Sequence, residues 1–367
     1  MKAKVTVHKL PVHTPFAIAS GTMEAADCVV LSLDDECGHT GLGEAAPFSA
    51  VTGENIAHTA AAVTSLCAAI ASVTPEHAIK ILVQAAQNTE FPISAICAVE
   101  SAVFDLIARR QGLPLWRIFG SPAVPKNSAT GAPAPIRITT DITVPVMAPE
   151  AVPAFMDKFA NHGFHDFKVK VGGNVDADTA SVRAVADWCS THNRPTTIIL
   201  DGNQGFDLVR ARALLGNLGR LKITPACFEQ PLPKSDLKNL AKLAATTSVP
   251  ILLDESVTTV GEIHQAYQEH AGSMINIKIT KSGVIESLRM ITAAKSLGLK
   301  MMIGGMLETE IAMGFSLHMA AGLGGFDFID LDTPFFIEQR LTRQSPWHEQ
   351  SSALLISNSP GSGLDPI

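Results

Sequence analysis

The chain has 367 residues, of which 46% are apolar and 17% charged, with a formal net charge of −7. This composition excludes a globally disordered protein. The acidic balance also argues against a nucleic-acid partner, because no basic surface is available to displace counterions from phosphates. The length suits one large domain and a smaller one.

The sequence carries no sign of secretion or of a membrane partner. Its six cysteines are scattered without a CxxC pair, as is typical of buried thiols in a reducing compartment. The N-terminal residues alternate like a strand and lack the apolar run of a signal peptide. No stretch of about 18 apolar residues occurs that could cross a membrane. We therefore expect a cytoplasmic protein.

The first third of the chain predicts strands followed by helices, an α+β arrangement. Alternating and β-branched residues mark the strands, and apolar spacings of three and four mark the helices. The strands are expected at 3–11, 28–34 and 38–47, and the helices at 54–72, 75–87 and 94–110. A segment rich in Pro, Ala, Ser and Gly at 121–136 predicts the domain boundary.

From Arg137 onward, eight short apolar runs alternate with helix-like stretches. They are ITTDITV, FHDFKVKV, TTIILDGN, ACFEQP, PILLDES, SMINIKI, KMMIGGM and FDFIDLD. From Lys170 to Asp330, the residues that close these runs, Gly304 among them, follow at intervals of 24 to 31 residues, which suits one strand, one helix and two loops. A doubly wound sheet would alternate in the same way, but eight units with polar ends favour a (β/α)-type barrel.

Three carboxylates close consecutive predicted strands: Asp201 in TTIILDGN, Glu229 in ACFEQP and Asp254 in PILLDES. The carboxyl ends of barrel strands converge on one face, and three acids there repel one another unless a cation is bound. An all-oxygen set without histidine or cysteine selects a hard cation, Mg²⁺ before Mn²⁺. The alternative is that each acid caps the following helix, but three in succession favour the metal.

Lysines flank these acids. Lys168 and Lys170 lie on the same side of their strand, while Phe167 and Val169 suit the helix-covered outside. Lys278 ends another strand, and three lysines around one barrel mouth are rare. Desolvation and nearby Mg²⁺ would lower a lysine pKa from about 10.4 toward about 7–8, which suits a general base. The alternative is that the lysines only neutralise the carboxylates.

The order of these residues around the barrel suggests a reaction. With the acids on strands three to five, Lys170 on strand two and Lys278 on strand six flank them from opposite sides. A substrate carboxylate on the metal would present its α-carbon between two amines. This arrangement fits removal of a proton from one face and delivery to the other.

A pair of acids closes the last run. Asp330 and Asp332 share one face of their strand, with Leu331 on the other. Two carboxylates without a metal form a suitable seat for a cation such as an ammonium group. A cap near Pro334 is the alternative interpretation.

Together these motifs resemble the enolase superfamily, in its muconate-lactonizing subgroup. The resemblance covers nearly the whole chain and includes GLGEAAP, AVFDLIARRQGLPLWRIFG, FKVKVG, LDGNQ, FEQP, LDES, NIKITKSG and MIGGMLET. The DLD pair of Asp330 and Asp332 resembles that of the dipeptide epimerases, where it receives the substrate's N-terminal ammonium. The mandelate racemase branch is disfavoured, because it places a histidine where this chain has Gly304 and Gly305.

The resemblance implies an α/β fold: a modified (β/α)7β TIM-type barrel with an α+β capping domain. The capping domain is expected at 1–130, completed by the tail at about 337–367, and the barrel at 131–336. The resemblance also implies that Asp201, Glu229 and Asp254 bind Mg²⁺ and that Lys170 and Lys278 are the acid/base catalysts. Lys168 would assist them by contacting the substrate carboxylate and lowering the pKa of Lys170. The implied substrate contacts are Thr143, Lys168, Gly305, Met306, Leu307, Asp330 and Asp332.

The sequence departs from this family in two places. The linker at 121–136 is longer than expected. The capping loop HTPFAIASGTMEAAD resembles the specificity loop in which epimerases of alanyl-glutamate carry arginine, but the candidate positions here hold Ser20, Gly21 and Met23, with Glu24 as the nearest charge. An acidic substrate side chain is therefore disfavoured.

The expected activity is that of an isomerase, a Mg²⁺-dependent epimerase. It would invert the α-carbon of the C-terminal residue of a dipeptide by 1,1-proton transfer through an ene-diolate. The alternatives within the superfamily are an N-acylamino-acid racemase, an o-succinylbenzoate synthase or another cycloisomerase, none of which needs an ammonium seat. Outside it, a Schiff-base aldolase needs one lysine but no metal acids, and a binding protein needs no catalytic groups. The sequence leaves open whether the chain forms a homo-oligomer.

Overall fold

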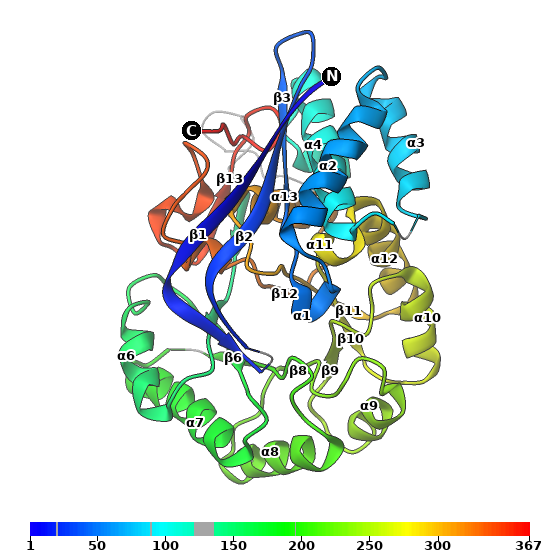
Figure 1. Cartoon of the computed structure of the whole chain (residues 1–367). Coiled ribbons are helices and arrows are strands. Elements are labelled where there is room, and N and C mark those ends of the chain that lie inside the picture. The colour runs from blue at the N-terminus through cyan, green and yellow to red at the C-terminus, as the bar shows by residue number, and fades with distance from the viewer. Residues whose placement is uncertain (20, 89, 121–135, 195) are drawn as a thin grey trace, which may run out of the picture.

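A computed structural model describes residues 1–19, 21–88, 90–120, 136–194 and 196–367. Figure 1 shows a ring of strands and helices, and beside it a sheet of long strands with helices packed on one side. The predicted linker at 121–136 lies outside the described residues except for its last one, Ile136.

The ring is a parallel eight-stranded sheet in the order β12-β11-β10-β9-β8-β7-β6-β5. Its strands fall within the eight predicted runs: β5 (Ile142–Val144), β6 (Asp166–Lys170), β7 (Thr197–Asp201), β8 (Cys227–Glu229), β9 (Ile251–Leu253), β10 (Met274–Ile277), β11 (Lys300–Ile303) and β12 (Phe328–Ile329). The backbone N–H of Asp141 donates to the carbonyl of Ile329 at 3.0 Å, which joins the segment before β5 to β12. The sheet therefore closes on itself.

Helices connect successive strands on the outside of the ring (Figure 1). They are η1 (Pro149–Ala151) with α6 (Val152–Asp157), α7 (Val175–Thr191), α8 (Leu208–Arg220), α9 (Leu237–Ala244), α10 (Val260–Gln268), α11 (Ile279–Ser282) with α12 (Val284–Leu297), and α13 (Glu310–Leu323). After β12 comes the one-turn η2 (Thr333–Phe335) in place of an eighth α-helix. The predicted modified (β/α)7β barrel is confirmed.

The barrel strands alternate between two apolar layers. Side chains such as Phe167 and Val169 point outward into the main core beneath the helices. Inward-facing residues form a separate cluster: Ile199, Cys227, Leu252, Met274 and Met302. Since side chains along a strand repeat every two residues, the next inward positions of these strands lie at the carboxyl ends, where the sequence is polar. The barrel interior is thus apolar along the strands and charged at the mouth, where the carboxyl ends of the strands lie.

The N-terminal domain is a three-stranded antiparallel sheet, β1 (Lys2–Ile18), β2 (Gly21–Asp34) and β3 (Thr40–Ala45). Its helices are α1 (Ser49–Thr52), α2 (Ile56–Ile70), α3 (Pro75–Ala85), α4 (Ile93–Arg110) and α5 (Trp116–Phe119). One sheet face, including Leu31, packs under α2–α4, and the other, including Val30, packs against Leu307 and Ile311 of the barrel. The predicted α+β domain is confirmed.

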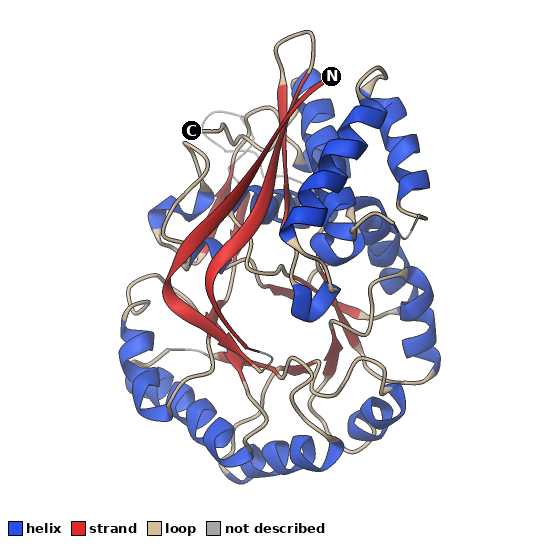
Figure 2. Cartoon of the chain, viewed as in Figure 1, coloured by secondary structure: helices blue, strands red, loops and turns tan. Residues whose placement is uncertain are grey.

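The strands β1 and β2 extend further than predicted, and Figure 2 shows them as one long hairpin. The segment expected to be a loop is paired: Phe16 lies opposite Met23, and Ile18 opposite Gly21. The prediction was wrong because Pro11 interrupts the alternation, whereas the structure absorbs it by a register shift between Pro11 and Phe16. The carbonyl of Ala17 accepts from the N–H of Val146 at 3.0 Å, so the hairpin end is fixed to the barrel.

Two buried glutamates of the N-terminal domain bind the first turns of barrel helices. Glu44 of β3 accepts from the N–H and hydroxyl of Thr309 at 2.9 and 2.6 Å, and from the N–H of Ala312 at 3.0 Å, at the start of α13. Glu100 of α4 accepts from the N–H of Val284 at 2.5 Å, at the start of α12. Because helix N-termini carry unpaired N–H groups and partial positive charge, these carboxylates hold the two domains together.

The C-terminal residues return to the N-terminal domain. The carbonyl of Gly361 accepts from Leu115, its N–H donates to Leu113, and Asp105 accepts from the N–H of Ser362 at 2.5 Å. Strand β13 (Ala353–Ile356) pairs with β4 (Ile136–Thr139). We propose that the tail from about 337 completes the capping domain and that the barrel spans 131–336, a division that the contacts of Gly361 and Ser362 support. The pairing of β13 with β4, in contrast, joins the tail to the first residues of the barrel segment.

Five of the six cysteines are buried as predicted, but Cys37 is exposed. Cys37 lies in the turn between β2 and β3, where its N–H donates to Asp35. Within the described residues, no helix is long and apolar enough to span a bilayer.

Candidate active site

The three predicted metal ligands lie next to one another at the barrel mouth. Asp201 and Glu229 are the last residues of β7 and β8 and are paired across these strands, and Asp254 directly follows β9. All three are buried. The helices that follow are capped by other side chains, those of Asp207, Asp236 and Thr259. The interpretation of the acids as helix caps is therefore wrong.

Lys168 links two groups of acids. Its Nζ lies 2.8 Å from Oε2 of Glu229 and 3.2 Å from Oδ2 of Asp201, which are predicted metal ligands. The same Nζ lies 2.6 Å from Oδ2 of Asp330. Lys168 is almost fully buried, as the predicted inward orientation requires.

The other two predicted lysines also contact the acids. The Nζ of Lys170 lies 2.6 Å from Oδ2 of Asp201, and the Nζ of Lys278 lies 2.6 Å from Oδ2 of Asp254. Asp254 is shared with a further buried lysine, Lys281, whose Nζ lies 2.6 Å from Oδ1. Lys170 and Lys278 thus approach the acids from β6 and from the end of β10.

The acids do not ionise equally. Burial opposes ionisation of Asp201, but Lys170 and the other lysines hold its pKa at about 2. Lys278 and Lys281 likewise outweigh burial at Asp254 and lower its pKa. At Glu229, burial and then the charge of Asp201 raise the pKa above its usual value. This is the repulsion expected of three acids at one mouth, and a bound cation would relieve it.

The lysine pKa values shift against the sequence-based expectation. Burial lowers the pKa of Lys168, but Asp330, Glu229 and Asp201 raise it well above its usual range. The pKa of Lys278 is likewise raised, mainly by Asp254, against the effect of burial. The protein's own carboxylates therefore favour the charged ammonium. The expected lowering depends on a cation that offsets these carboxylates.

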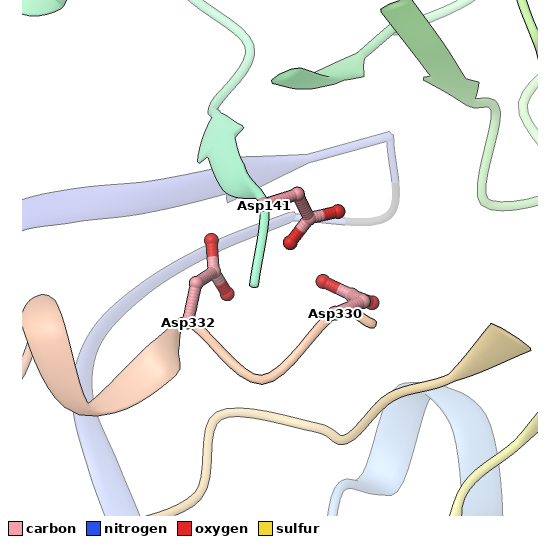
Figure 3. A group of neighbouring side chains, drawn as sticks. All are labelled: Asp141, Asp330 and Asp332. Atoms are coloured by element: carbon pink, nitrogen blue, oxygen red, sulfur yellow. The ribbon is translucent and has the colours of Figure 1, made fainter. Parts of the chain in front are cut away.

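A second group of acids comprises Asp141, Asp330 and Asp332, all buried, with one oxygen of each within 4.8 Å of the others. Figure 3 shows the three carboxyl groups turned toward a common space. Oδ2 of Asp332 accepts from the N–H of Thr143 at 2.5 Å. Asp332 stands at the N-cap position of η2 but makes no side-chain cap bond, so the alternative interpretation as a cap is wrong for this residue.

The predicted substrate contacts line one cavity. From the barrel it is lined by Thr143, Lys168, Lys170, Lys278, Gly305, Met306, Leu307, Asp330 and Asp332, together with Asp254. The capping domain contributes four apolar side chains, Phe16, Ile18, Met23 and Phe48. Met23 lines this cavity, as expected for the capping loop that resembles a specificity loop. Ser20 lies outside the described residues.

Sequence reasoning missed several residues of this site. Asp141 is the only acid in the run ITTDITV, a signal that could have been followed. Asn276, whose Nδ2 donates to Oε1 of Glu229 at 2.7 Å, precedes Lys278 by two residues and so shares its inward face. Phe16 and Phe48 gave no local signal, because their place in the cavity depends on how the two domains pack.

Known protein families match both parts of this chain. The N-terminal domain of mandelate racemase and muconate lactonizing enzymes matches residues 1–120, and the enolase C-terminal domain-like family matches residues 144–366. The chain belongs to the enolase superfamily. The resemblance identified from the sequence motifs is thereby confirmed.

Members of this superfamily with assigned activities resemble the whole chain. The hydrophobic dipeptide epimerase of Citrifermentans bemidjiense is 33% identical, over 99% of this chain and 97% of its own length. The aromatic dipeptide epimerase of Herpetosiphon aurantiacus is 36% identical, over 90% of this chain and 88% of its own. Like these relatives, this superfamily member is an isomerase.

Solved structures agree over the full length. A mandelate racemase/muconate lactonizing protein from Herpetosiphon aurantiacus superposes with a TM-score of 0.90 at 33% identity, over 100% of this chain and 98% of its own. A dipeptide epimerase from Enterococcus faecalis, complexed with Mg and the dipeptide L-Leu-L-Tyr, superposes with a TM-score of 0.90 at 26% identity, over 99% of each chain. This enolase-superfamily chain thus shares its fold with structures that contain a metal and a dipeptide.

Proposed function

We propose that the protein is a Mg²⁺-dependent epimerase that inverts the α-carbon of the C-terminal residue of a dipeptide with an apolar second side chain. The observation that carries the proposal is the composition of one cavity. Three lysines, an acid pair and an apolar wall from the capping domain all line it. The hydrophobic dipeptide epimerase and the aromatic dipeptide epimerase among the relatives support the same assignment.

The chemistry of the donor set fits Mg²⁺. Asp201, Glu229 and Asp254 offer oxygen ligands only, are buried, and are adjacent at the barrel mouth. When bound, the cation would offset the charge of the substrate carboxylate and of these acids. Neighbouring solved structures described as complexed with Mg and dipeptide support this assignment.

Lys170 and Lys278 would act as the two acid/base groups. They line the same cavity from β6 and from the segment after β10, strands that lie four positions apart in the sheet. An α-carbon held between them would lose its proton to one amine and receive a proton from the other on the opposite face. Lys168, paired with Glu229 and Asp201, would hold the substrate carboxylate.

Asp330 and Asp332 would hold the ammonium of the first residue. Both line the cavity, and the N–H of Thr143 orients Asp332. An N-acylated amino acid carries no cation to pair with these buried carboxylates, which disfavours the N-acylamino-acid racemase and o-succinylbenzoate synthase alternatives.

The capping domain would select the second side chain. Phe16, Ile18, Met23 and Phe48 form an apolar wall, and Glu24 is exposed. A buried substrate glutamate would lie here without a cation at a cost of several kcal/mol, whereas each buried methylene gains about 0.8 kcal/mol.

The proposal is tested by incubating a library of L,L-dipeptides with the Mg²⁺-loaded protein in deuterated water. We expect apolar dipeptides to gain one mass unit and a second diastereomer, and their N-acetyl derivatives to react far more slowly. Exchange of N-acetyl amino acids in preference to dipeptides would contradict the ammonium seat, and exchange of neither would contradict the proposed activity.

A further inference from the structure

The acid cluster at the closure of the barrel holds more negative charge than its surroundings balance. Asp141, Asp330 and Asp332 lie with oxygens within 4.8 Å of one another. The charges that act most strongly on Asp141 are those of these two acids and of Lys168, followed by Asp166. Lys168 also contacts two acids of the predicted metal site. Three buried carboxylates at this distance cannot all be ionised, so they share at least one proton.

The hydrogen bonds indicate which acid holds that proton. Oδ2 of Asp330 accepts from Nζ of Lys168 at 2.6 Å, and Oδ2 of Asp332 accepts from the N–H of Thr143 at 2.5 Å, so each of these carboxylates has a donor. Both side-chain oxygens of Asp141 are buried without a hydrogen-bond partner among the described residues. An ionised carboxylate without a donor is the most costly form to bury.

We propose that Asp141 is a carboxylic acid in the folded enzyme and that its O–H donates to the Asp330–Asp332 pair. Asp141 is then a positioning residue: it orients the two ionised carboxylates toward the ammonium group of the first residue of a dipeptide. Burial, then the charges of Asp330 and Asp332, raise the pKa of Asp141 well above its usual value, in agreement with this geometry.

The position of Asp141 explains why it acts through other residues. Its backbone N–H donates to Ile329 at the closure of the barrel, one residue before Asp330. Figure 3 shows its carboxyl group reaching toward Asp330 from the segment before β5. Asp330 and Asp332, in contrast, line the cavity. A proton on Asp141 leaves two negative charges in the cluster instead of three, which matches one substrate ammonium and Lys168.

The alternative occupant of the cluster is a divalent cation, since three carboxylates could bind one. A cation bound there would require all three acids to be ionised. The two possibilities therefore predict opposite protonation of Asp141, and an experiment on that proton separates them.

The proton is tested directly by infrared difference spectroscopy on the whole protein at pH 7. We expect the wild type to show a protonated-carboxyl band that is lost in D141N, persists in D332N and is unchanged by Mg²⁺. A spectrum in which D141N removes no acid band, or a band that disappears when Mg²⁺ is added, would overturn the proposal. This measurement needs no turnover, so its result does not depend on the proposed function. Only the positioning role of the proton rests on that function.

Kinetics test the positioning role. Asparagine keeps a donor in the place of the O–H, whereas leucine removes it. We expect D141L to raise KM for alanyl-phenylalanine at least tenfold with a smaller effect on kcat, and D141N to recover most of that loss. An equal rise of KM in D141N and D141L would mean that Asp141 acts through its negative charge, and would overturn the proposal. This outcome counts even if D141L folds poorly, provided that D141N folds.

Discussion

The Nζ atom of Lys168 lies 2.6 Å from Oδ2 of Asp330, which joins β6 to the segment that follows β12 across the barrel mouth. The same Nζ lies 2.8 Å from Glu229. One buried lysine thus connects the proposed metal ligands to the proposed ammonium seat. The two ends of a bound dipeptide, carboxylate and ammonium, would lie on either side of it.

The metal assignment predicts that excess chelator abolishes turnover and that added Mg²⁺ restores it. E229Q should weaken Mg²⁺ binding at least about tenfold, because affinity depends on the number of charged ligands. Isothermal titration calorimetry on the folded variant gives this number directly. D254N is a poorer choice, since it also leaves Lys278 and Lys281 without their buried partner. Full activity in excess chelator would contradict the assignment.

The two-base arrangement predicts that K170A and K278A each stop epimerization. Each variant should still exchange the α-proton of one epimer with deuterated water, because the other lysine remains. The two variants should exchange opposite epimers, which makes each the control for the other. Normal epimerization in either variant would show that its lysine is not a required base.

The sequence predicted the barrel and its mouth because both follow from local patterns. A strand end every 24 to 31 residues and a side-chain period of two are enough to place Asp201, Glu229 and Lys168 at one inward-facing edge. The extent of the β1–β2 hairpin could not be predicted, because Pro11 breaks the alternation and cross-strand pairing compensates for it.

Contacts between residues far apart in the sequence account for the features that could not be predicted. Glu44 binds the start of α13 at a sequence separation of 265 residues, and Asp141 becomes a buried acid only when the barrel closes onto Ile329. The direction of the lysine pKa shifts also depends on the distances between lysine nitrogens and carboxylates, which the spacing of residues along the sequence does not give. Lys168 has three carboxylates within 3.2 Å, and these outweigh its burial.

Glu44 and Glu100, which join the two domains, are expected to make the free energy of unfolding depend on pH. Burial raises the pKa of both Glu44 and Glu100 to about 7, against hydrogen bonds that lower it. A raised carboxyl pKa means that the folded state takes up protons which the unfolded state has released. The stability that these two glutamates contribute is therefore highest below pH about 4.5 and is lost as pH rises through about 7.

Urea unfolding of the wild type and of E44Q, from pH 5 to pH 8, measures the contribution of Glu44. We expect E44Q to reduce the loss of stability over this range by up to about 3 kcal/mol, since one pKa unit corresponds to about 1.4 kcal/mol. E100Q serves as the matched variant at the other contact between the domains. An unchanged slope in both variants would contradict the raised pKa values.

The apolar wall predicts that one substitution can change substrate choice. Met23 lines the cavity opposite Phe16 on the hairpin, so M23R would bring a cation toward the second side chain. We expect the ratio of kcat/KM for alanyl-glutamate to that for alanyl-phenylalanine to rise about tenfold or more, because a charge-assisted hydrogen bond contributes about 1.5–3 kcal/mol. M23L is the control and should leave the ratio near its wild-type value. A ratio equal in M23R and M23L would mean that Met23 does not face the substrate.

The most direct measurement is kcat/KM of the Mg²⁺-loaded wild type for alanyl-phenylalanine, alanyl-leucine and alanyl-glutamate under identical conditions. All three substrates carry the same ammonium and carboxylate, so their differences report the capping-domain wall alone. We predict that both apolar dipeptides are epimerized and that each exceeds alanyl-glutamate by at least tenfold, given several kcal/mol for an unpaired buried charge. A kcat/KM for alanyl-glutamate above those of both apolar dipeptides would contradict the proposed specificity, and no epimerization of any of the three would contradict the proposed function.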